Sequence, residues 1–240
     1  VIKLFWRNAM QNNLKAAVLA ALLLAPAVSF AQEAAAEEES NFSWNFGAVS
    51  DYVFRGVSQS NREMAIQGGV DYAFGDSGFY VGSWASTVDY GEADAPDYEV
   101  DFYAGYNTDL GEKFNLDLMA VRYTYYGEQN DFGSIDYNEF ITKLEMKNVA
   151  TLTVGYTDDY GNSGEDATYA NLGNSWDLGK DYTLSAGFGR IFDDANGSFN
   201  DWNVGISKSI SNVEFGLNYY DTNLDERASE SVVLSVKFGG

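Results

Sequence analysis

The chain has no cysteine and no histidine among its 240 residues. Without them it can form no disulfide, no Ser–His or Cys–His nucleophilic site and none of the usual zinc sites. Two carboxylates alone can hydrolyse glycosides, but no Asp or Glu pair stands out in the sequence. We therefore expect no enzyme, no cofactor and no bound metal. The missing thiols are compatible with an exported bacterial protein.

Proline and basic residues are also scarce. The chain has only two prolines, which favours uninterrupted β-strands because proline cannot donate to a β-ladder. Lys and Arg number 14 against 36 Asp and Glu, which gives a net charge of −22. Since phosphate binding needs clustered basic side chains, no nucleic-acid partner is expected.

The apolar run at 16–27 is too short for a membrane-spanning helix, which needs about 20 residues. Lys15 precedes this run and Ser29-Phe30-Ala31 follows it as a small-x-small cleavage motif. We therefore predict a cleaved secretory signal over residues 1–31, with a buried helix of a soluble protein as the alternative. Val1 is not a conventional start, whereas Met10 begins a conventional signal sequence.

Residues 32–41 contain an Ala/Glu tract that we expect to be a disordered acidic leader. From residue 42 onward the composition changes, and aromatic and glycine residues become frequent. We expect residues 42–240 to form one folded domain.

Two kinds of residue alternate from Phe42 to Phe54. The even positions are mostly aromatic or apolar, whereas the odd positions are mostly small or polar. A period of two places the two sets on opposite faces of one β-strand. The pattern recurs, and we predict twelve strands: 42–54, 63–74, 79–88, 98–107, 114–126, 135–146, 149–158, 168–176, 182–191, 201–208, 213–220 and 231–238.

The connections between these strands alternate in length. Short links near 75–78, 108–113, 147–148, 177–181 and 209–212 alternate with longer ones, which hold much of the acidic charge. Outer-membrane barrels have short periplasmic turns, longer external loops and an even number of strands. The fold class predicted is therefore an all-β, antiparallel transmembrane barrel of about 12 strands in the Gram-negative outer membrane, with periplasmic termini.

Aromatic residues mark both ends of the predicted strands, as in the aromatic girdles of such barrels. We assign the periplasmic girdle to Trp44, Phe74, Tyr106, Phe114, Trp176, Tyr182 and Phe238. We assign the external girdle to Tyr52, Phe54, Tyr98, Tyr156, Phe188, Trp202 and Tyr219. The alternative is a soluble β-sandwich or barrel whose aromatic residues pack a core.

The last predicted strand carries Val232, Leu234, Val236 and Phe238 on one face. Alternating apolar residues that end in an aromatic resemble the signal read by the bacterial barrel-assembly machinery, although two glycines follow Phe238. We therefore expect this machinery as a partner during biogenesis, and outer-membrane lipid as the permanent surroundings.

Charged and polar residues at inward positions are the candidates for a functional site. Either they form a selectivity constriction, or they form a network of paired side chains that fills and stabilises a narrow barrel. The lumen candidates are Asp51, Arg55, Arg62, Glu63, Glu99, Asp101, Tyr103, Glu139 and Lys143. Twelve strands lie between the filled and the open barrel sizes, so the width of the bore stays undecided.

The loop at 158–166 is rich in acidic residues. Such a loop suggests Ca²⁺, which takes about 6–8 oxygen ligands. The full ligand spacing of an EF-hand is missing, however, and we interpret the segment as a solvated acidic loop.

Several segments resemble the TorF family of proteobacterial porins. The similarity is carried by Ser50-Asp51-Tyr52-Val53-Phe54-Arg55-Gly56-Val57-Ser58-Gln59-Ser60, by 78–86, by 99–106 and by 123–126. It covers most of the chain after the signal and is strongest over 42–145. The resemblance implies an outer-membrane barrel, and it implies no particular solute and no catalytic residues.

The function expected from these observations is passive diffusion of small hydrophilic solutes or ions through an outer-membrane channel. Its acidic surface and lumen suggest a preference for cations. The alternative is a closed structural or adhesive barrel that acts through its acidic external loops. A third, weaker hypothesis is a lumen that binds one ligand in an aromatic pocket.

Overall fold

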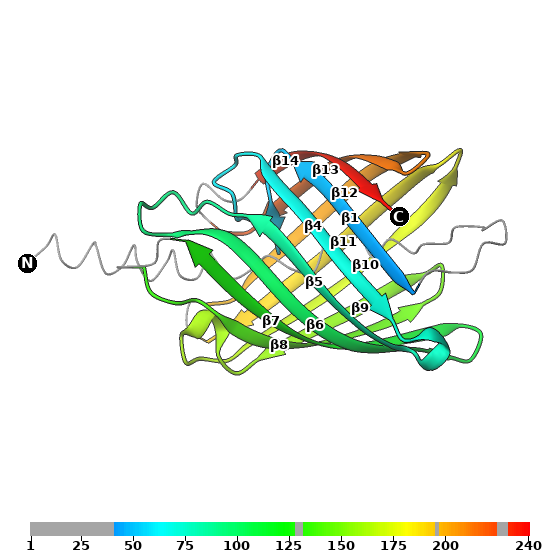
Figure 1. The fold of residues 1–240 in the computed structure, drawn as a ribbon, viewed down its shortest axis with the longest axis horizontal. Coiled ribbons are helices and arrows are strands. Elements are labelled where there is room, and N and C mark those ends of the chain that lie inside the picture. The colour runs from blue at the N-terminus through cyan, green and yellow to red at the C-terminus, as the bar shows by residue number, and fades with distance from the viewer. Residues whose placement is uncertain (1–40, 128–131, 195–196, 225–229) are drawn as a thin grey trace, which may run out of the picture.

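The computed structural model describes residues 41–127, 132–194, 197–224 and 230–240. The predicted signal and nearly all of the acidic leader therefore lie outside the described residues. Twelve antiparallel strands close into a single barrel (Figure 1). They are β1 (Phe42–Val49), β4 (Ala65–Ala73), β5 (Phe79–Thr87), β6 (Pro96–Leu110), β7 (Phe114–Gly127), β8 (Tyr137–Met146), β9 (Ala150–Thr157), β10 (Ala167–Gly179), β11 (Tyr182–Asp193), β12 (Phe199–Ile210), β13 (Val213–Thr222) and β14 (Glu230–Gly239).

The strands follow one another around the wall in chain order, and the first strand closes the circle. β1 pairs with β4 on one side and with β14 on the other, where Phe46 lies opposite Phe238. Closure leaves no unpaired sheet edge. The twelve strands and the closed antiparallel topology predicted from the alternation are thus confirmed.

The two mouths of the barrel differ. At the short-turn mouth, β10 and β11 are joined through Lys180 and Asp181, and the 3₁₀ turn η1 (Gly75–Ser77) joins β4 to β5. At the long-loop mouth, the connections are longer, and one of them contains the 3₁₀ turn η2 (Tyr160–Asn162). Among the described residues, no helix has the length and apolar character to cross a bilayer.

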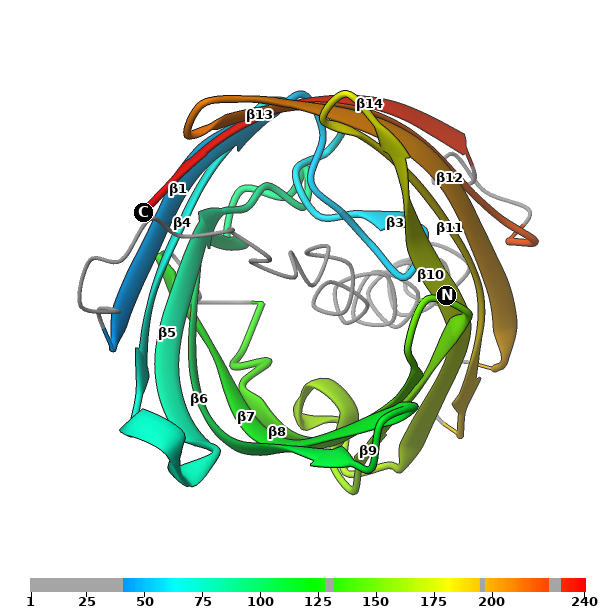
Figure 2. The same ribbon diagram turned by 90° about the vertical axis from the view of Figure 1, so that its right-hand side faces the viewer.

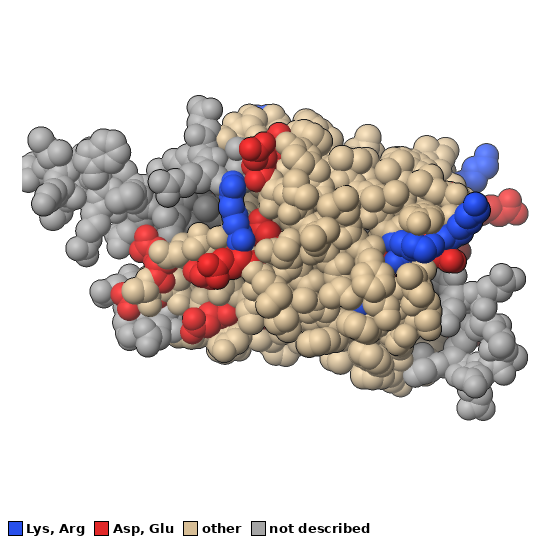
Figure 3. Space-filling view, turned by 90° about the horizontal axis from the view of Figure 1, so that it is seen from above, with Lys and Arg blue, Asp and Glu red and all other residues tan. Residues whose placement is uncertain are grey.

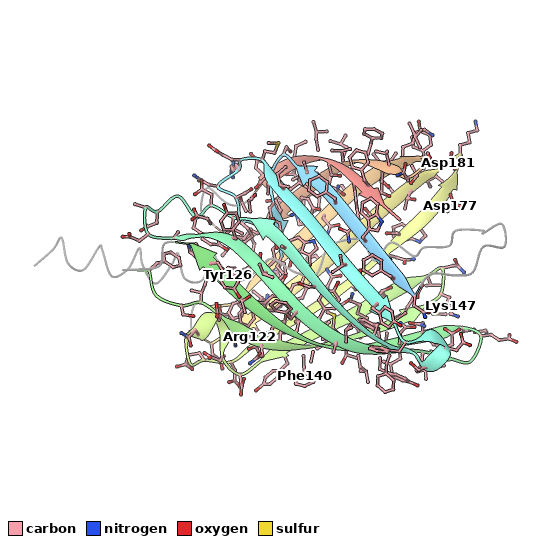
Figure 4. All side chains as sticks on the ribbon, viewed as in Figure 1. Arg122, Tyr126, Phe140, Lys147, Asp177 and Asp181 are labelled. Atoms are coloured by element: carbon pink, nitrogen blue, oxygen red, sulfur yellow. The ribbon has the colours of Figure 1, made fainter. Side chains whose placement is uncertain are left out.

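The outer wall is apolar over most of its height. Large hydrophobic side chains from every barrel strand are exposed, including Phe46, Phe102, Phe140, Leu172 and Leu234. Figure 4 shows Phe140 pointing away from the barrel. On the face seen in Figure 3, acidic side chains gather at the long-loop end, and an almost uncharged band separates them from the charges at the other end. An apolar band of this kind is the surface that a bilayer covers.

One segment leaves the wall and enters the barrel. After β1 the chain forms a small hairpin from β2 (Val53–Phe54) and β3 (Val57–Ser58), which pair only with each other. Figure 2 shows this hairpin inside the ring of barrel strands. The prediction of one strand over 42–54 was therefore wrong beyond Val49. The placement of Tyr52 and Phe54 in an external girdle was wrong too, because both are buried, at 5% and 1% exposure.

The hydrophobic core lies in the lumen, at the half next to the long-loop mouth. Phe54 and Val57 of the hairpin, with Tyr52 just before it, pack there against inward side chains from the adjoining strand ends and loops. Those partners include Val121, Tyr123, Tyr125, Ile135, Tyr137, Ile141, Tyr160, Tyr169, Ile191 and Phe199. The hydrophobic effect thus favours a filled lumen at this end.

Candidate lumen site

The hairpin in the lumen turns through two residues, Arg55 and Gly56. Because Val53 pairs with Ser58 and Phe54 with Val57, only these two residues form the turn. Their φ angles are 46° and 80°, and two positive angles in a row are the mark of a type I′ turn. A Cβ on Gly56 would also meet Thr222 on β13 and Asp201 on β12. Glycine is therefore required here by both conformation and space. We call β2, β3 and this turn the lumen hairpin.

Arg55, at the tip of the lumen hairpin, is held by the wall on two sides. Its Nη2 donates to both carboxylate oxygens of Glu139 on β8, at 2.7 and 2.9 Å. Its guanidinium lies over the ring of Tyr169 on β10, 4.3 Å from the centroid. Tyr123 on β7 also donates to Glu139, at 2.9 Å. Charge-assisted hydrogen bonds from one guanidinium nitrogen to both carboxylate oxygens, together with the ring of Tyr169, restrict the orientation of the guanidinium.

Tyr52 joins the hairpin to a second part of the wall. Its hydroxyl donates to Oε2 of Glu99 on β6 at 2.9 Å, and the hydroxyl of Tyr125 donates to Oε1 at the same distance. Tyr52 precedes β2 and is almost fully buried. Burial, followed by the charge of Glu99, raises the pKa of the Tyr52 hydroxyl above its ordinary value.

Asp51 fixes the base of the hairpin. One carboxylate oxygen accepts hydrogen bonds from Ser58 at 2.6 Å and from Ser60 at 3.2 Å. The other oxygen accepts from Ser231 on β14. Together with the contacts of Tyr52 and Arg55, these bonds connect the hairpin to β6, β8, β10 and β14, which are spread around the barrel.

The half of the lumen next to the short-turn mouth has a different lining. Tyr103 on β6 donates to Asp71 on β4 at 2.6 Å, and Tyr80 on β5 donates to Asp117 on β7 at 2.9 Å. Lys143 on β8 lies opposite Asp117 in the register. Across β10 to β13 many inward positions carry small or amide side chains, which occupy little volume: Gly173, Ser175, Ser185, Gly187, Asn203, Gly205, Ser207, Gly216 and Asn218. The inward carboxylate of Glu214 on β13 accepts a hydrogen bond from Ser207 at 3.2 Å.

The structure separates the nine predicted lumen residues into three groups. Five are buried within the long-loop half of the lumen: Asp51, Arg55, Glu99, Asp101 and Glu139. Tyr103 and Lys143 are half-buried on the inner wall closer to the short-turn mouth. Arg62 and Glu63 are exposed on the segment that precedes β4.

The tyrosines that hold the buried carboxylates were missed by sequence reasoning. Tyr123 and Tyr125 share the inward parity of β7, and Tyr169 does so on β10. Their parity relative to the apolar face was a signal that could have found them. Tyr52 was assigned to the wrong face because the alternation continues without a break from β1 into the hairpin.

In the acidic loop near η2, Asp159 accepts a hydrogen bond from the backbone N–H of Gly164 at 2.8 Å.

A closed twelve-stranded barrel with an apolar exterior and a polar inner wall defines the class of outer-membrane-type β-barrels. The family model described as "Bacterial protein of unknown function (Gcw_chp)" matches residues 33–238, and the chain belongs to this family. A search of the curated proteins finds no match.

Solved structures share the fold at low sequence identity. One is described as "KdgM porin in complex with disordered oligogalacturonate"; it has a TM-score of 0.50 and 10% identity, over 82% of this chain and 98% of that one. A membrane-protein structure from work on in-meso crystallization has a TM-score of 0.55 and 10% identity, over 82% and 83% of the two chains. The outer membrane protein Omp33 of Acinetobacter baumannii has a TM-score of 0.48 and 12% identity, over 83% and 98%.

Proposed function

We propose that this protein is a porin-like channel of the bacterial outer membrane, through which small hydrophilic solutes or ions diffuse passively. The long-loop mouth would face the exterior and the short-turn mouth the periplasm, as in other outer-membrane barrels. Lipid would cover the apolar band, and the barrel-assembly machinery would read the last strand. We also propose that the chain is a porin of the TorF type and that residues 1–31 are a cleaved secretory signal.

One observation carries the proposal: the lumen hairpin lies inside the long-loop half of the lumen, packed against inward side chains of the wall. The hairpin pairs with no barrel strand, so it can move without breaking the twelve-strand ladder. Behind it the inner wall is polar, with Asp71, Asp117 and Lys143 half-buried. The lumen thus has a polar wall and is closed at one end by a hairpin that side-chain contacts hold in place. This arrangement favours a channel that opens when the hairpin moves.

The fold of the KdgM porin supports the same proposal, since it is shared over most of both chains. That porin is described in complex with an oligogalacturonate. For this chain the solute stays general, and the acidic residues of the lumen make a preference for cations the expected direction.

The second candidate is a closed structural or adhesive barrel. It is favoured by the Arg55–Glu139 pair and the buried aromatic cluster around it, because a lumen filled by paired side chains is what a permanently closed barrel needs. In this case the acidic loops at the exterior would carry the function.

Planar-bilayer recording separates the two candidates. The refolded chain would be reconstituted and its current measured under a KCl gradient. Discrete conductance steps, with a reversal potential on the cation side, are the expected result for the channel. A folded barrel that stays silent across the voltage range would refute the channel and support the closed barrel.

A further inference from the structure

Two carboxylates on β6, Glu99 and Asp101, are completely buried beneath the long-loop mouth, each with 0% exposure. They lie two residues apart, so both project from the same face of the strand, and they interact electrostatically. Within the described ranges neither forms a salt bridge with a lysine or arginine. Arg55, the buried cation of this region, is engaged by Glu139.

Asp101 carries the strongest sign that a ligand is needed. Both of its carboxylate oxygens are buried, and neither has a hydrogen-bond partner among the described residues. Its neighbours across the two flanking strands are Trp84 on β5 and Tyr123 on β7, and the Tyr123 hydroxyl is directed to Glu139. A buried charge without a partner costs several kcal/mol, on the order given for ions moved out of water.

Phenol oxygens contact Glu99. Tyr52 and Tyr125 donate one hydrogen bond to each oxygen of Glu99, which leaves a further lone pair on each oxygen. The hydroxyl of Tyr90, from the loop between β5 and β6, interacts electrostatically with Glu99 and Asp101, is buried, and has no hydrogen-bond partner among the described residues. Carboxylate and hydroxyl oxygens are hard ligands, which select hard cations.

We propose that Glu99 and Asp101 bind one divalent cation of the Ca²⁺ type. A charge of +2 neutralises the two carboxylates. The free lone pairs of both side chains and the Tyr90 hydroxyl supply protein oxygens, and water completes the shell. Among the described residues no group of three or more acidic side chains gathers as a metal cluster. The site is therefore of the weaker class, with half-saturation at about 10⁻⁴–10⁻³ M.

The position of the site gives the cation a structural effect. Tyr52 belongs to the chain that enters the lumen, Tyr90 to the loop after β5, and the two carboxylates to the wall. A cation at Glu99 and Asp101 would hold these three parts together, so it would stabilise the closed long-loop half. The inference is independent of whether the barrel conducts.

The test is calcium-dependent stability of the full chain refolded in detergent micelles. Thermal unfolding would be followed by circular dichroism, first in EDTA and then with increasing CaCl₂. The wild type should melt at a higher temperature as calcium rises, whereas Asp101→Asn should need at least about tenfold more calcium for the same rise. In EDTA, Asp101→Asn should be at least as stable as the wild type, because one uncompensated buried charge is gone.

Asp117→Asn is the matched control. It removes the same charge from an inward carboxylate that already accepts a hydrogen bond from the Tyr80 hydroxyl. The calcium response of this variant should equal that of the wild type. If Asp101→Asn does not fold, Glu99→Gln replaces it with the same expectation. Sensitised Tb³⁺ luminescence gives a second reading, because tyrosines adjoin the site.

The proposal is overturned if calcium leaves the wild-type melting temperature unchanged. It is equally overturned if Asp101→Asn and Asp117→Asn respond like the wild type, since calcium would then act through the exposed acidic loops.

Discussion

Arg55 and Glu139 are 84 residues apart in the sequence and form a buried ion pair in the lumen, with Nη2 2.7 Å from Oε1 and 2.9 Å from Oε2. Each side chain is 1% exposed. One partner comes from a turn and the other from the barrel wall. The pair therefore joins the lumen hairpin to the barrel wall.

Removing one member of this pair should be costly. Arg55→Met leaves the Glu139 carboxylate buried with only the Tyr123 hydroxyl, and we expect a loss of about 3–5 kcal/mol in the free energy of unfolding. Replacing both residues, as in Arg55→Met/Glu139→Leu, should cost less than the sum of the single changes. Urea unfolding of the refolded barrel measures the four free energies.

The exposed pair Arg122–Asp136, at 3.4 Å, is the control for these variants. Arg122→Ala should change the free energy of unfolding by about 0–1 kcal/mol, because solvent screens this pair. Equal costs for Arg55→Met and Arg122→Ala would contradict the role given to the buried pair.

Gly56→Ala should disturb the lumen hairpin more than its backbone strain alone explains. The residue has a φ of +80°, and an added Cβ would meet Thr222 and Asp201. Gly164→Ala is a matched control, with a φ of +77° and nothing within 4 Å of the added atom. Strain costs on the order of 1–3 kcal/mol at both sites, so the excess at Gly56 isolates the wall contact. Equal losses in urea unfolding would show that the hairpin tip does not press on the wall.

Ion selectivity should depend on the half-buried charges rather than on the fully buried ones. In an open channel Asp117 lines the inner wall, whereas Asp101 is shielded at 0% exposure. We expect Asp117→Asn to shift the reversal potential under a KCl gradient toward zero, and Asp101→Asn to shift it less. The opposite order would place the selectivity filter at the long-loop half of the lumen.

Alkaline pH should destabilise the barrel through its buried phenols. Burial is the largest influence on Tyr52, Tyr90 and Tyr160, which lie outside the barrel strands, and it raises the pKa of each hydroxyl above its ordinary value. The folded state then keeps protons that the unfolded state loses above about pH 10, so the free energy of unfolding falls as pH rises beyond this point. Below that pH these groups contribute no pH dependence.

The variant Tyr160→Phe should flatten this alkaline decline, whereas Tyr98→Phe, at an exposed position on β6, should leave it unchanged. Urea midpoints measured between about pH 9 and 11 give the slopes. A slope that is the same in both variants would mean that Tyr160 ionises normally.

The wall of the barrel could be predicted from the sequence because its rule is local. Along β14, for example, Val232, Leu234 and Phe238 are exposed, as their parity indicates. In a strand with one face toward lipid and the other toward the lumen, the residue pattern repeats every two positions. This pattern can be recognised in the sequence without knowing which distant residues lie nearby in the folded barrel.

The interior could be predicted only in part. Asp51, Arg55, Glu99, Asp101 and Glu139 were predicted as lumen residues, and all five are buried. The lumen hairpin was not, because Tyr52 and Phe54 keep the alternation of β1 after the chain has left the wall. Whether an aromatic residue meets lipid or fills the lumen depends on tertiary contacts such as those of Tyr169 and Tyr160, which no local pattern contains.

The central claim is that the lumen hairpin closes the barrel, and single-channel recording of a shortened variant tests it most directly. Residues 53–58 would be replaced by two glycines, with the twelve barrel strands unchanged and folding checked by circular dichroism. We predict larger and longer-lived conductance steps for the shortened variant than for the full chain in the same bilayer. Identical currents from the two proteins, whether both silent or both open, would contradict the claim.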